Sequence, residues 1–598
     1  MPVIRDALAP HQEALRERLW AVVDKPAAPA RERLRAAAAL AKFDPESETW
    51  ARAGASVVDD LVRENPVFLG QWSEMFRPVR NRLIPRLSAI FRDPAPERAA
   101  ERSLATNLLA DYAADQPPVL ADLLMDADAK QFAVIYPKLK ELGDKGLPLL
   151  IGEIDKTLPP ELPSSDDKRE TLAKRQANAA VALLRLDSPL TPGPSPTRGE
   201  GSKKVWPLLK HSPDPRVRSY LIHRLFPLGA DPASIVRRLD EEPDLSARRA
   251  LLLALGEFDE ATLPLASRTA VLPKVQAMYR DDPDPGLHAA AEWLLRQWKQ
   301  DGWIRQQNEE WAKDNERRDR ASRAAFAPGA SRQWYVNTQG QTFVVIPGPV
   351  EFLMGSPPTE KDREEREVQH KRRISRTFAI AAKSVTLAEY RRLTKDKYEI
   401  GERWTYAPDL PVVGINWYMA ANYCNRLSKE EGIPEEEWVY EIKGNEIKLK
   451  ANYLSLTGYR LPTEAEMEYA TRAGATTSRY YGETEELLGQ YAWYTKNTND
   501  VLKPVGLKKP NDFGLFDSQG NCFTWCQEAY ALYPKAGGDD AVEDKEGDLV
   551  IVSTHSRVLR GGSFSNLALH VRASSRNYYV PTFRTLHYGF RPARTLRP

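Results

Sequence analysis

The most distinctive segment in the second half of this chain is Tyr459-Arg-Leu-Pro-Thr-Glu-Ala-Glu-Met-Glu-Tyr-Ala-Thr-Arg-Ala-Gly474. Thr463 followed three residues later by Glu466 is the pattern of a capping box, in which the two residues satisfy each other's backbone N–H groups at the start of a helix. Glu464 and Glu468 lie on the same short helix. We therefore expect these carboxylates to have a structural role rather than a catalytic one.

Further motifs flank this helix in a fixed order. They are Phe343-Val-Val-Ile-Pro-Gly348, Pro411-Val-Val-Gly-Ile-Asn-Trp417, Asn511-Asp-Phe-Gly-Leu-Phe516, Gly520-Asn-Cys-Phe-Thr-Trp-Cys526, Arg557-Val-Leu-Arg-Gly-Gly-Ser563 and Gly589-Phe-Arg591. The set resembles the sulfatase-modifying-factor family, whose founding members are formylglycine-generating enzymes, and the match spans about residues 341–595. The resemblance implies an α+β domain with the C-type-lectin-like fold of the formylglycine-generating enzymes.

The first half of the chain reads as helical throughout. Arg31-Glu-Arg-Leu-Arg-Ala-Ala-Ala-Ala-Leu40 consists of strong helix formers. The turns His211-Ser-Pro-Asp-Pro215, Glu242-Pro-Asp-Leu245 and Asp282-Pro-Asp-Pro285 each break one helix and supply an N-cap oxygen for the next. They recur every 30 to 40 residues or so, the range of HEAT-like helical pairs. We expect an all-α HEAT-like solenoid; a non-repetitive helical bundle is the alternative.

Composition then divides the chain. We expect an N-terminal helical region over 1–186, a Pro/Gly-rich disordered loop over 187–204, HEAT-like repeats over 205–300, a charged helical linker over 301–333 and the α+β domain over 334–598.

Charge and composition exclude several classes of protein. The 598 residues include 85 Lys plus Arg against 83 Asp plus Glu, a formal net charge of +2. A nucleic-acid-binding protein would show a clearly basic domain, so we expect no nucleic-acid partner. No run approaches the ~18 apolar residues of a membrane span, and an acidic residue, Asp6, stands where a secretory signal needs its apolar run. We expect a cytoplasmic protein without a membrane segment.

The cysteines argue against copper chemistry. The resemblance implies that copper-dependent formylglycine-generating enzymes carry two cysteines between the Arg-Gly-Gly-Ser and Gly-Phe-Arg motifs. Such a pair suits copper, because soft thiolates select Cu(I). Here residues 564–579 contain no cysteine: Leu569 or His570 lies near the first position and Ala573 near the second. Cys522 and Cys526 lie in a core motif. We expect buried structural thiols, no copper and no catalytic residue.

The resemblance also implies calcium sites. The Gly-Asn motif of the family continues to Trp-Glu-Trp, whose carboxylate suits a hard cation. Thr524 replaces that acid here. Asn521 and Asn497 remain as weak calcium ligands, so the sequence leaves calcium open as a cofactor.

The segment between Ser563 and Gly589 is rich in aromatic and amide side chains, which suit adaptable recognition. The candidate ligand-binding residues are Asn566, His570, Asn577, Tyr578, Tyr579, Phe583, His587 and Tyr588. We therefore predict a non-catalytic module on a helical scaffold that binds a protein or small-molecule ligand.

Two alternatives stay open. One is an oxidase of the same family, formylglycine-generating or non-heme iron, with a non-standard metal site at His555, His570 and His587. The other is an adaptor for a separately encoded Ser/Thr kinase, since the layout resembles bacterial modular proteins in which such a kinase precedes helical repeats and this domain. Asp512-Phe-Gly514 spells a kinase magnesium-binding tripeptide, but the other kinase motifs are absent, so we interpret it as a turn.

Overall fold

The computed structural model describes residues 2–25, 28–187, 200–314, 332–394, 407–443, 446–534 and 540–597. These residues form two compact units. Unit 1 comprises residues 1–157, 174–205 and 227–230, and unit 2 comprises residues 158–173, 206–226 and 231–598. Residues 188–199 of the predicted loop and 315–331 of the predicted linker lie outside the described residues.

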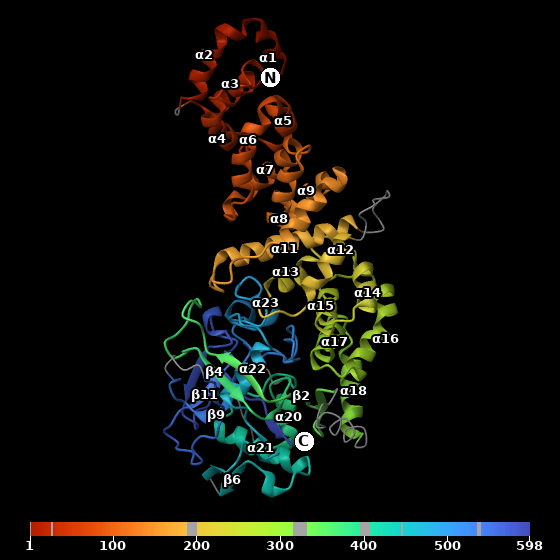
Figure 1. Ribbon diagram of the computed structural model, residues 1–598, viewed down its shortest axis with the longest axis vertical. Coiled ribbons are helices and arrows are strands. Elements are labelled where there is room, and N and C mark those ends of the chain that lie inside the picture. Colours follow the sequence, from red (N-terminus) through yellow and green to blue (C-terminus); the bar gives the residue numbers. More distant parts are fainter. Residues whose placement is uncertain are drawn as a thin grey trace. The chain divides into compact units, whose positions relative to one another are not determined.

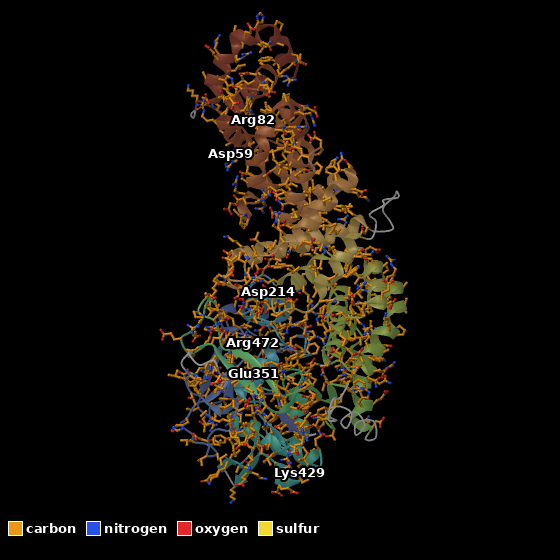
Figure 2. All side chains as sticks on the ribbon, viewed as in Figure 1. Asp59, Arg82, Asp214, Glu351, Lys429 and Arg472 are labelled. Carbon is orange, nitrogen blue, oxygen red and sulfur yellow. The ribbon has the colours of Figure 1, made fainter. Side chains whose placement is uncertain are left out.

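Unit 1 is entirely helical in its described part (Figure 1). Its helices are α1 (Pro2–Leu8), α2 (Gln12–Val23), α3 (Ala30–Phe43), α4 (Trp50–Leu61), α5 (Leu69–Phe76), α6 (Arg80–Phe91), α7 (Ala99–Tyr112), α8 (Pro117–Asp126), α9 (Ala129–Glu141), α10 (Leu147–Ile154), α12 (Glu200–Val205) and most of α11 (Asp167–Leu186). Helices adjacent in sequence pack together: α2 on α3, α6 on α7, and α8 on α9. The alanine run within α3 is buried, because small side chains allow close helix contact. Charged side chains occupy the outer faces, as at Asp59, which pairs with Arg86 (Figure 2).

Six more helices open unit 2. They are α13 (Arg216–Arg224), α14 (Pro232–Glu241), α15 (Leu245–Leu255), α16 (Leu265–Asp281), α17 (Pro285–Gln297) and α18 (Asp301–Lys313). The predicted caps are confirmed at two turns: Asp244 accepts the N–H groups of the first turn of α15, and Asp284 accepts that of Leu287 in α17. The first turn differs, because Pro215 stands at the N-cap of α13. Asp214 accepts a 3.3 Å bond from the backbone N–H of Arg216 and pairs mainly with the guanidinium of the same residue.

The rest of unit 2 is mixed α/β. Its helices are α20 (Leu387–Leu393), α21 (Trp417–Glu430), α22 (Glu464–Arg472), α23 (Leu488–Tyr491) and α24 (Thr495–Thr498). Its strands are β1 (Trp334–Val336), β2 (Thr342–Ile346), β3 (Val350–Met354), β4 (His370–Ile374), β5 (Thr377–Ala381), β6 (Tyr440–Lys443), β7 (Glu446–Leu449), β8 (Tyr459–Arg460), β9 (Phe523–Ala529), β10 (Val542–Glu543), β11 (Arg557–Arg560), β12 (Arg576–Tyr579), β13 (Tyr588–Gly589) and β14 (Ala593–Leu596). The sheet orders are β1-β2-β5-β14-β8, β10-β4-β3, β12-β11-β9-β13 and β6-β7.

Two apolar clusters hold these sheets and helices. One packs α21 against the β2–β5 side and includes Trp417, Trp525 and Phe590; the other packs α22 against β4, β9 and β11. The contacts of α22 therefore fix β9 and β11 in place, and β12 is held beside β11 in the same sheet.

The predicted capping box is confirmed. The Thr463 hydroxyl accepts the N–H of Glu466 at 3.1 Å, and the Glu466 carboxylate accepts the N–H of Thr463 at 2.9 Å. Arg460 donates two 2.7 Å bonds to the same carboxylate, and Arg576 pairs with Glu464 at 2.6 Å. Other buried ion pairs join Glu468 to Arg472 and Arg560, and Arg572 to Glu360 and Glu367. The carboxylates of α22 thus bind arginines inside the protein; Arg472 is labelled in Figure 2.

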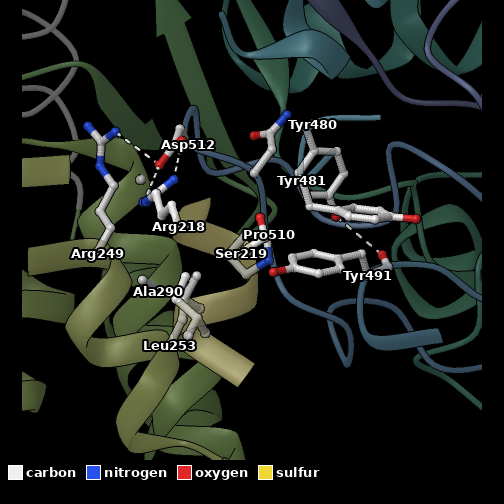
Figure 3. A pocket seen from close by; sticks show the side chains of 13 residues that line it. Arg218, Ser219, Arg249, Leu253, Ala290, Tyr480, Tyr481, Tyr491, Pro510 and Asp512 are labelled. Atoms are coloured by element: carbon white, nitrogen blue, oxygen red, sulfur yellow. Dashed lines mark hydrogen bonds and ion pairs between the residues drawn. The ribbon is translucent and has the colours of Figure 1, made fainter. Parts of the chain in front are cut away.

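Helices α13, α15 and α17 meet the loop around Asp512 within unit 2 (Figure 3). Arg218 donates bonds of 2.6 and 2.9 Å to the Asp512 carboxylate, which also lies 2.7 Å from Nδ1 of His211 and 3.5 Å from Arg249. Burial alone would raise the pKa of Asp512, but Arg218 above all outweighs it, so this pKa lies far below its ordinary value. The cavity beside this carboxylate measures about 20 Å³, room for about one water molecule. The predicted turn therefore carries a carboxylate, Asp512, whose ion pairs join helices α13 and α15 to the α/β part of unit 2.

The same contact brings two glycines face to face. A Cβ on Gly286, in the first turn of α17, would lie 2.3 Å from the carbonyl oxygen of Asp512. Gly514 has a φ of +85°, and a Cβ there would lie 2.5 Å from the carbonyl oxygen of Pro285. Only glycine permits this approach of the two backbones.

None of the helices in the described ranges is long and apolar enough to cross a membrane.

Candidate ligand-binding surface

Strand β12 carries the centre of the predicted surface and lies at one edge of its sheet. It pairs antiparallel with β11, with Val558 opposite Tyr578 and Arg557 opposite Tyr579. Tyr578 and Tyr579 are 39% and 40% exposed. Because successive side chains of a strand point to opposite faces, the two tyrosines contribute to two different clusters.

The first cluster is built on Tyr579. Its ring stacks on that of Phe583 with centroids 3.8 Å apart, and Phe583 is 37% exposed. Tyr588 lies beneath them at 6% exposure, with its ring against Phe523 and Trp525 of the core. Burial, with a smaller contribution from Tyr579, raises the pKa of Tyr588 to about 12. Tyr579 and Phe583 thus form the accessible face, and Tyr588 supports it from the core.

The second cluster is built on Tyr578. Its ring stacks on that of Tyr530 with centroids 4.0 Å apart, and the guanidinium of Arg366 lies 5.7 Å from its centroid. On the same side, Arg576 lies 3.7 Å from the ring centroid of Tyr533. Tyr530, Tyr533 and Arg366 were not expected from the sequence, because they lie far before β12 along the chain and approach it only in the folded protein. We call the residues of the two clusters the β12 aromatic surface.

The remaining candidates have local partners. The Asn566 side chain accepts the N–H and hydroxyl of Ser563, both at 2.8 Å, and His587 lies 3.1 Å from the Ser565 hydroxyl. Burial lowers the pKa of His587. The Asn577 side chain accepts the N–H of Tyr578 at 2.8 Å, which covers an N–H group at the sheet edge. This blunts the edge for strand addition, so recognition here would depend on side chains.

His570 belongs to neither cluster. Its Nδ1 lies 3.7 Å from the Glu364 carboxylate. Among the residues that the structure describes, no three His, Cys, Asp or Glu side chains are grouped as a metal site. Iron at His555, His570 and His587 stays a prediction of the sequence.

All three cysteines of the chain are described, and all are buried and unpaired with one another. Burial raises the pKa of Cys522 to about 11 and holds the pKa values of Cys424 and Cys526 above their ordinary value as well. Cys424 and Cys526 belong to different apolar clusters. A thiolate is the reactive form of cysteine, so none of the three is prepared as a nucleophile or a soft metal ligand.

The two asparagines predicted as weak calcium ligands have structural bonds. Oδ1 of Asn521 accepts the N–H of Lys503 at 3.2 Å, and its amide donates to the Lys503 carbonyl at 2.9 Å. Oδ1 of Asn497 accepts the N–H of Tyr494 at 2.9 Å. Calcium needs six or more oxygen ligands, and these oxygens already accept hydrogen bonds. The residues fit a calcium ion poorly, and calcium stays a prediction of the sequence.

The second half of the chain is similar to a known protein family. A family model described as Sulfatase-modifying factor enzyme 1-like domain matches residues 330–596. A formylglycine-generating enzyme of Streptomyces coelicolor is 28% identical over 307 residues, which cover 45% of this chain and 93% of that protein. A serine/threonine-protein kinase pkn1 of Chlamydia pneumoniae is 30% identical over 186 residues, which cover 31% of this chain. Only 24% of that kinase is spanned.

Among solved structures, Treponema denticola variable protein 1 shows 27% identity, covering 43% of this chain and 95% of that protein with a TM-score of 0.35.

Proposed function

Because residues 330–596 form a sulfatase-modifying factor enzyme 1-like domain, we propose that this domain is a non-catalytic binding module with a C-type-lectin-like fold. The observation that carries the proposal is a pair of facts: aromatic side chains are exposed around β12, while every cysteine of the chain is buried. The module binds its ligand and leaves it chemically unchanged.

The burial of the cysteines supports a domain that does not catalyse copper-dependent oxidation of a thiol. Oxidation of a substrate thiol through copper needs accessible thiolates, because only the deprotonated sulfur binds Cu(I) and attacks. Residues 564–588 contain no cysteine, and the pKa values of Cys424, Cys522 and Cys526 are raised by burial.

The β12 aromatic surface supports binding. Tyrosine offers a large rigid contact area at a low cost in side-chain entropy, which is why binding loops use it. Tyr578, Tyr579 and Phe583 are each more than a third exposed although their rings stack on neighbours. A protein segment or small molecule with apolar or ring-shaped groups would cover these rings.

The helices serve as the scaffold in this proposal. Neighbouring helices of both units pack in sequence order, as α8 does on α9 and α16 on α17, which supports HEAT-like pairing. The relatives named serine/threonine kinases favour a second role, as an adaptor for a separately encoded kinase. A kinase encoded next to this gene that binds the full chain in purified form would support that role.

The binding role is tested with a triple variant, Tyr578→Ala, Tyr579→Ala and Phe583→Ala, of the full chain. Purified protein is screened against peptide and glycan arrays, and the affinity for each hit is measured by calorimetry. We expect the triple variant to lose at least tenfold in affinity, since aromatic anchors dominate such interfaces. The control is Leu353→Ala with Ile442→Ala, two exposed apolar residues outside this surface. Equal losses in both variants would contradict the proposal.

The oxidase alternative is tested separately. The purified full chain is analysed for copper and iron, and oxygen uptake is followed with a cysteinyl peptide. We expect neither stoichiometric metal nor thiol-dependent oxygen uptake. Stoichiometric metal that is lost in a His570→Ala variant, together with conversion of the cysteine to an aldehyde, would replace the binding proposal by the oxidase.

A further inference from the structure

A second cavity lies within unit 2, away from the β12 aromatic surface. It measures about 280 Å³ and is lined by Gly256, Glu257, Trp293, Gln297, Gln490, Leu507, Lys508 and Lys509. Its walls come from the end of α15, the last turns of α17, helix α23 and the loop before Asp512. Neither the family motifs nor the proposed binding surface accounts for this cavity.

The floor of the cavity is charged and rigid. Lys509 is buried, pairs with the Glu257 carboxylate and lies 4.4 Å from the ring centroid of Trp293. The other oxygen of Glu257 lies 3.4 Å from Nδ1 of His223. Burial alone would raise the pKa of Glu257, but His223 and Lys509 lower it to about 2, so this group is a fixed carboxylate.

Lys508 provides the cation in the wall. Its ammonium donates to the carbonyl oxygen of Gly489 and lies 3.8 Å from the ring centroid of Trp493. An ammonium has three N–H donors, so this bond leaves donors for a ligand. Burial, and then the nearby Lys509, lower the pKa of Lys508 to about 8, and Asp517 opposes this shift by less.

The rim offers neutral donors. The side chains of Gln297 and Gln490 are exposed, and within the described ranges their amide groups have no hydrogen bond to the protein. The lining thus contains two ammonium groups and one carboxylate, with two amide groups beside them. The ring of Trp293 is covered by Lys509, so little apolar surface remains for a hydrophobic ligand.

We propose that this cavity binds a small hydrophilic oxyanion of the phosphate class, held by Lys508 and the amides of Gln297 and Gln490. Lys509 contributes long-range positive charge while its own ammonium stays paired with Glu257. Charge-assisted hydrogen bonds are stronger than neutral ones, so the ammonium of Lys508 contributes more to holding the anion than the two amides do. The ligand is inorganic phosphate or the phosphate group of a small ester.

The test is calorimetric titration of the full chain with inorganic phosphate and with glycerol 3-phosphate, at ionic strength fixed with chloride. We expect Lys508→Gln to weaken phosphate binding about tenfold or more, the loss expected for one charge-assisted bond. The matched control is Lys503→Gln: Lys503 lies 5.8 Å from the centroid of the same Trp493 ring but does not line the cavity. Affinity of this control should equal that of the unchanged protein.

A second variant guards against misfolding of the first. Glu257→Gln removes the carboxylate of the floor, so we expect it to bind phosphate several-fold more tightly. Tighter binding of glycerol 3-phosphate than of phosphate would identify an ester as the ligand, and the reverse would identify the free ion. The proposal is overturned if the unchanged protein binds neither anion, or if Lys508→Gln and Lys503→Gln behave alike.

Discussion

Asp512 and Glu528 both carry partly buried carboxylates in unit 2, yet their pKa values move in opposite directions. At Asp512, burial favours protonation, but Arg218 and Arg249 outweigh it and the pKa falls far below its ordinary value. At Glu528, burial comes first and the nearby Asp544 and Glu464 add to it, so the pKa rises to about 8. Burial acts to raise both pKa values, so the charge of the neighbours decides whether that shift is reversed, as at Asp512, or reinforced, as at Glu528.

The two carboxylates give stability opposite pH dependences. A lowered pKa contributes stability above the unfolded value, which is lost as pH falls; for Asp512 this loss begins below its ordinary value of 3.8. A raised pKa contributes stability below the unfolded value, which is lost as pH rises; for Glu528 this window runs from 4.5 to about 8. Unit 2 should be most stable in mildly acidic solution.

The largest effect is expected where the cations depend on one carboxylate. Asp512→Ala leaves Arg218 and Arg249 without this buried partner, so we expect unit 2 to lose about 3–5 kcal/mol in its free energy of unfolding. Urea denaturation followed by tryptophan fluorescence measures the loss. Asp155→Ala, which breaks an exposed pair with Lys204 in unit 1, is the control and should cost under about 1 kcal/mol. Equal costs for the two variants would show that the ion pairs of Asp512 do not hold the helices to the α/β part of unit 2.

An intermediate effect with the opposite sign is expected at Glu528. Glu528→Gln removes a carboxyl that must ionise in the interior as pH rises, so the melting temperature at pH 8.5 should increase by several degrees. At pH 5 the variant and the unchanged protein should differ little, because the group is protonated in the folded state. Thermal melts at both pH values check this, with the exposed Glu441→Gln as control. A variant that is less stable at pH 8.5 would mean that the carboxylate is charged and paired.

The smallest effect is expected at Thr463, a neutral hydrogen-bond donor to Asp544, which is one of the carboxylates near Glu528. The Thr463 hydroxyl donates to Asp544 at 2.8 Å and caps α22. Thr463→Ala should cost about 1 kcal/mol of unfolding free energy, and Thr463→Ser should restore most of it. Denaturant titration of both variants at pH 6 tests this. Failure of serine to restore stability would assign the loss to the missing methyl group.

Local patterns were readable from the sequence and long-range contacts were not. The capping box at Thr463 and Glu466, and the caps at Asp244 and Asp284, follow from spacings of a few residues, and all are confirmed. The helical character of the described residues before 315 and the family that matches residues 330–596 were also predicted correctly, whereas the HEAT-like repeats stay a prediction.

The candidate surface shows where such prediction ends. Tyr578 and Tyr579 are adjacent in sequence, so nothing local indicates that one stacks on Tyr530 and the other on Phe583. Tyr588 looks like its aromatic neighbours in composition, but the pairing of β13 with β9 places it against the core. Sheet pairing thus decides which aromatic side chains are accessible, and a single sequence does not reveal it.

The meeting of Gly286 and Gly514 has a consequence for protein engineering. At each glycine, the backbone of the opposite segment occupies the space that a side chain would need. The α/β part therefore cannot be transferred to other helices without a matching partner surface. A chimera that grafts it onto foreign helices must carry helix α17 along, or it will expose a surface shaped only for that partner. A substitution at Gly286 requires the segment around Asp512 to move away, and a substitution at Gly514 is strained by its positive φ as well.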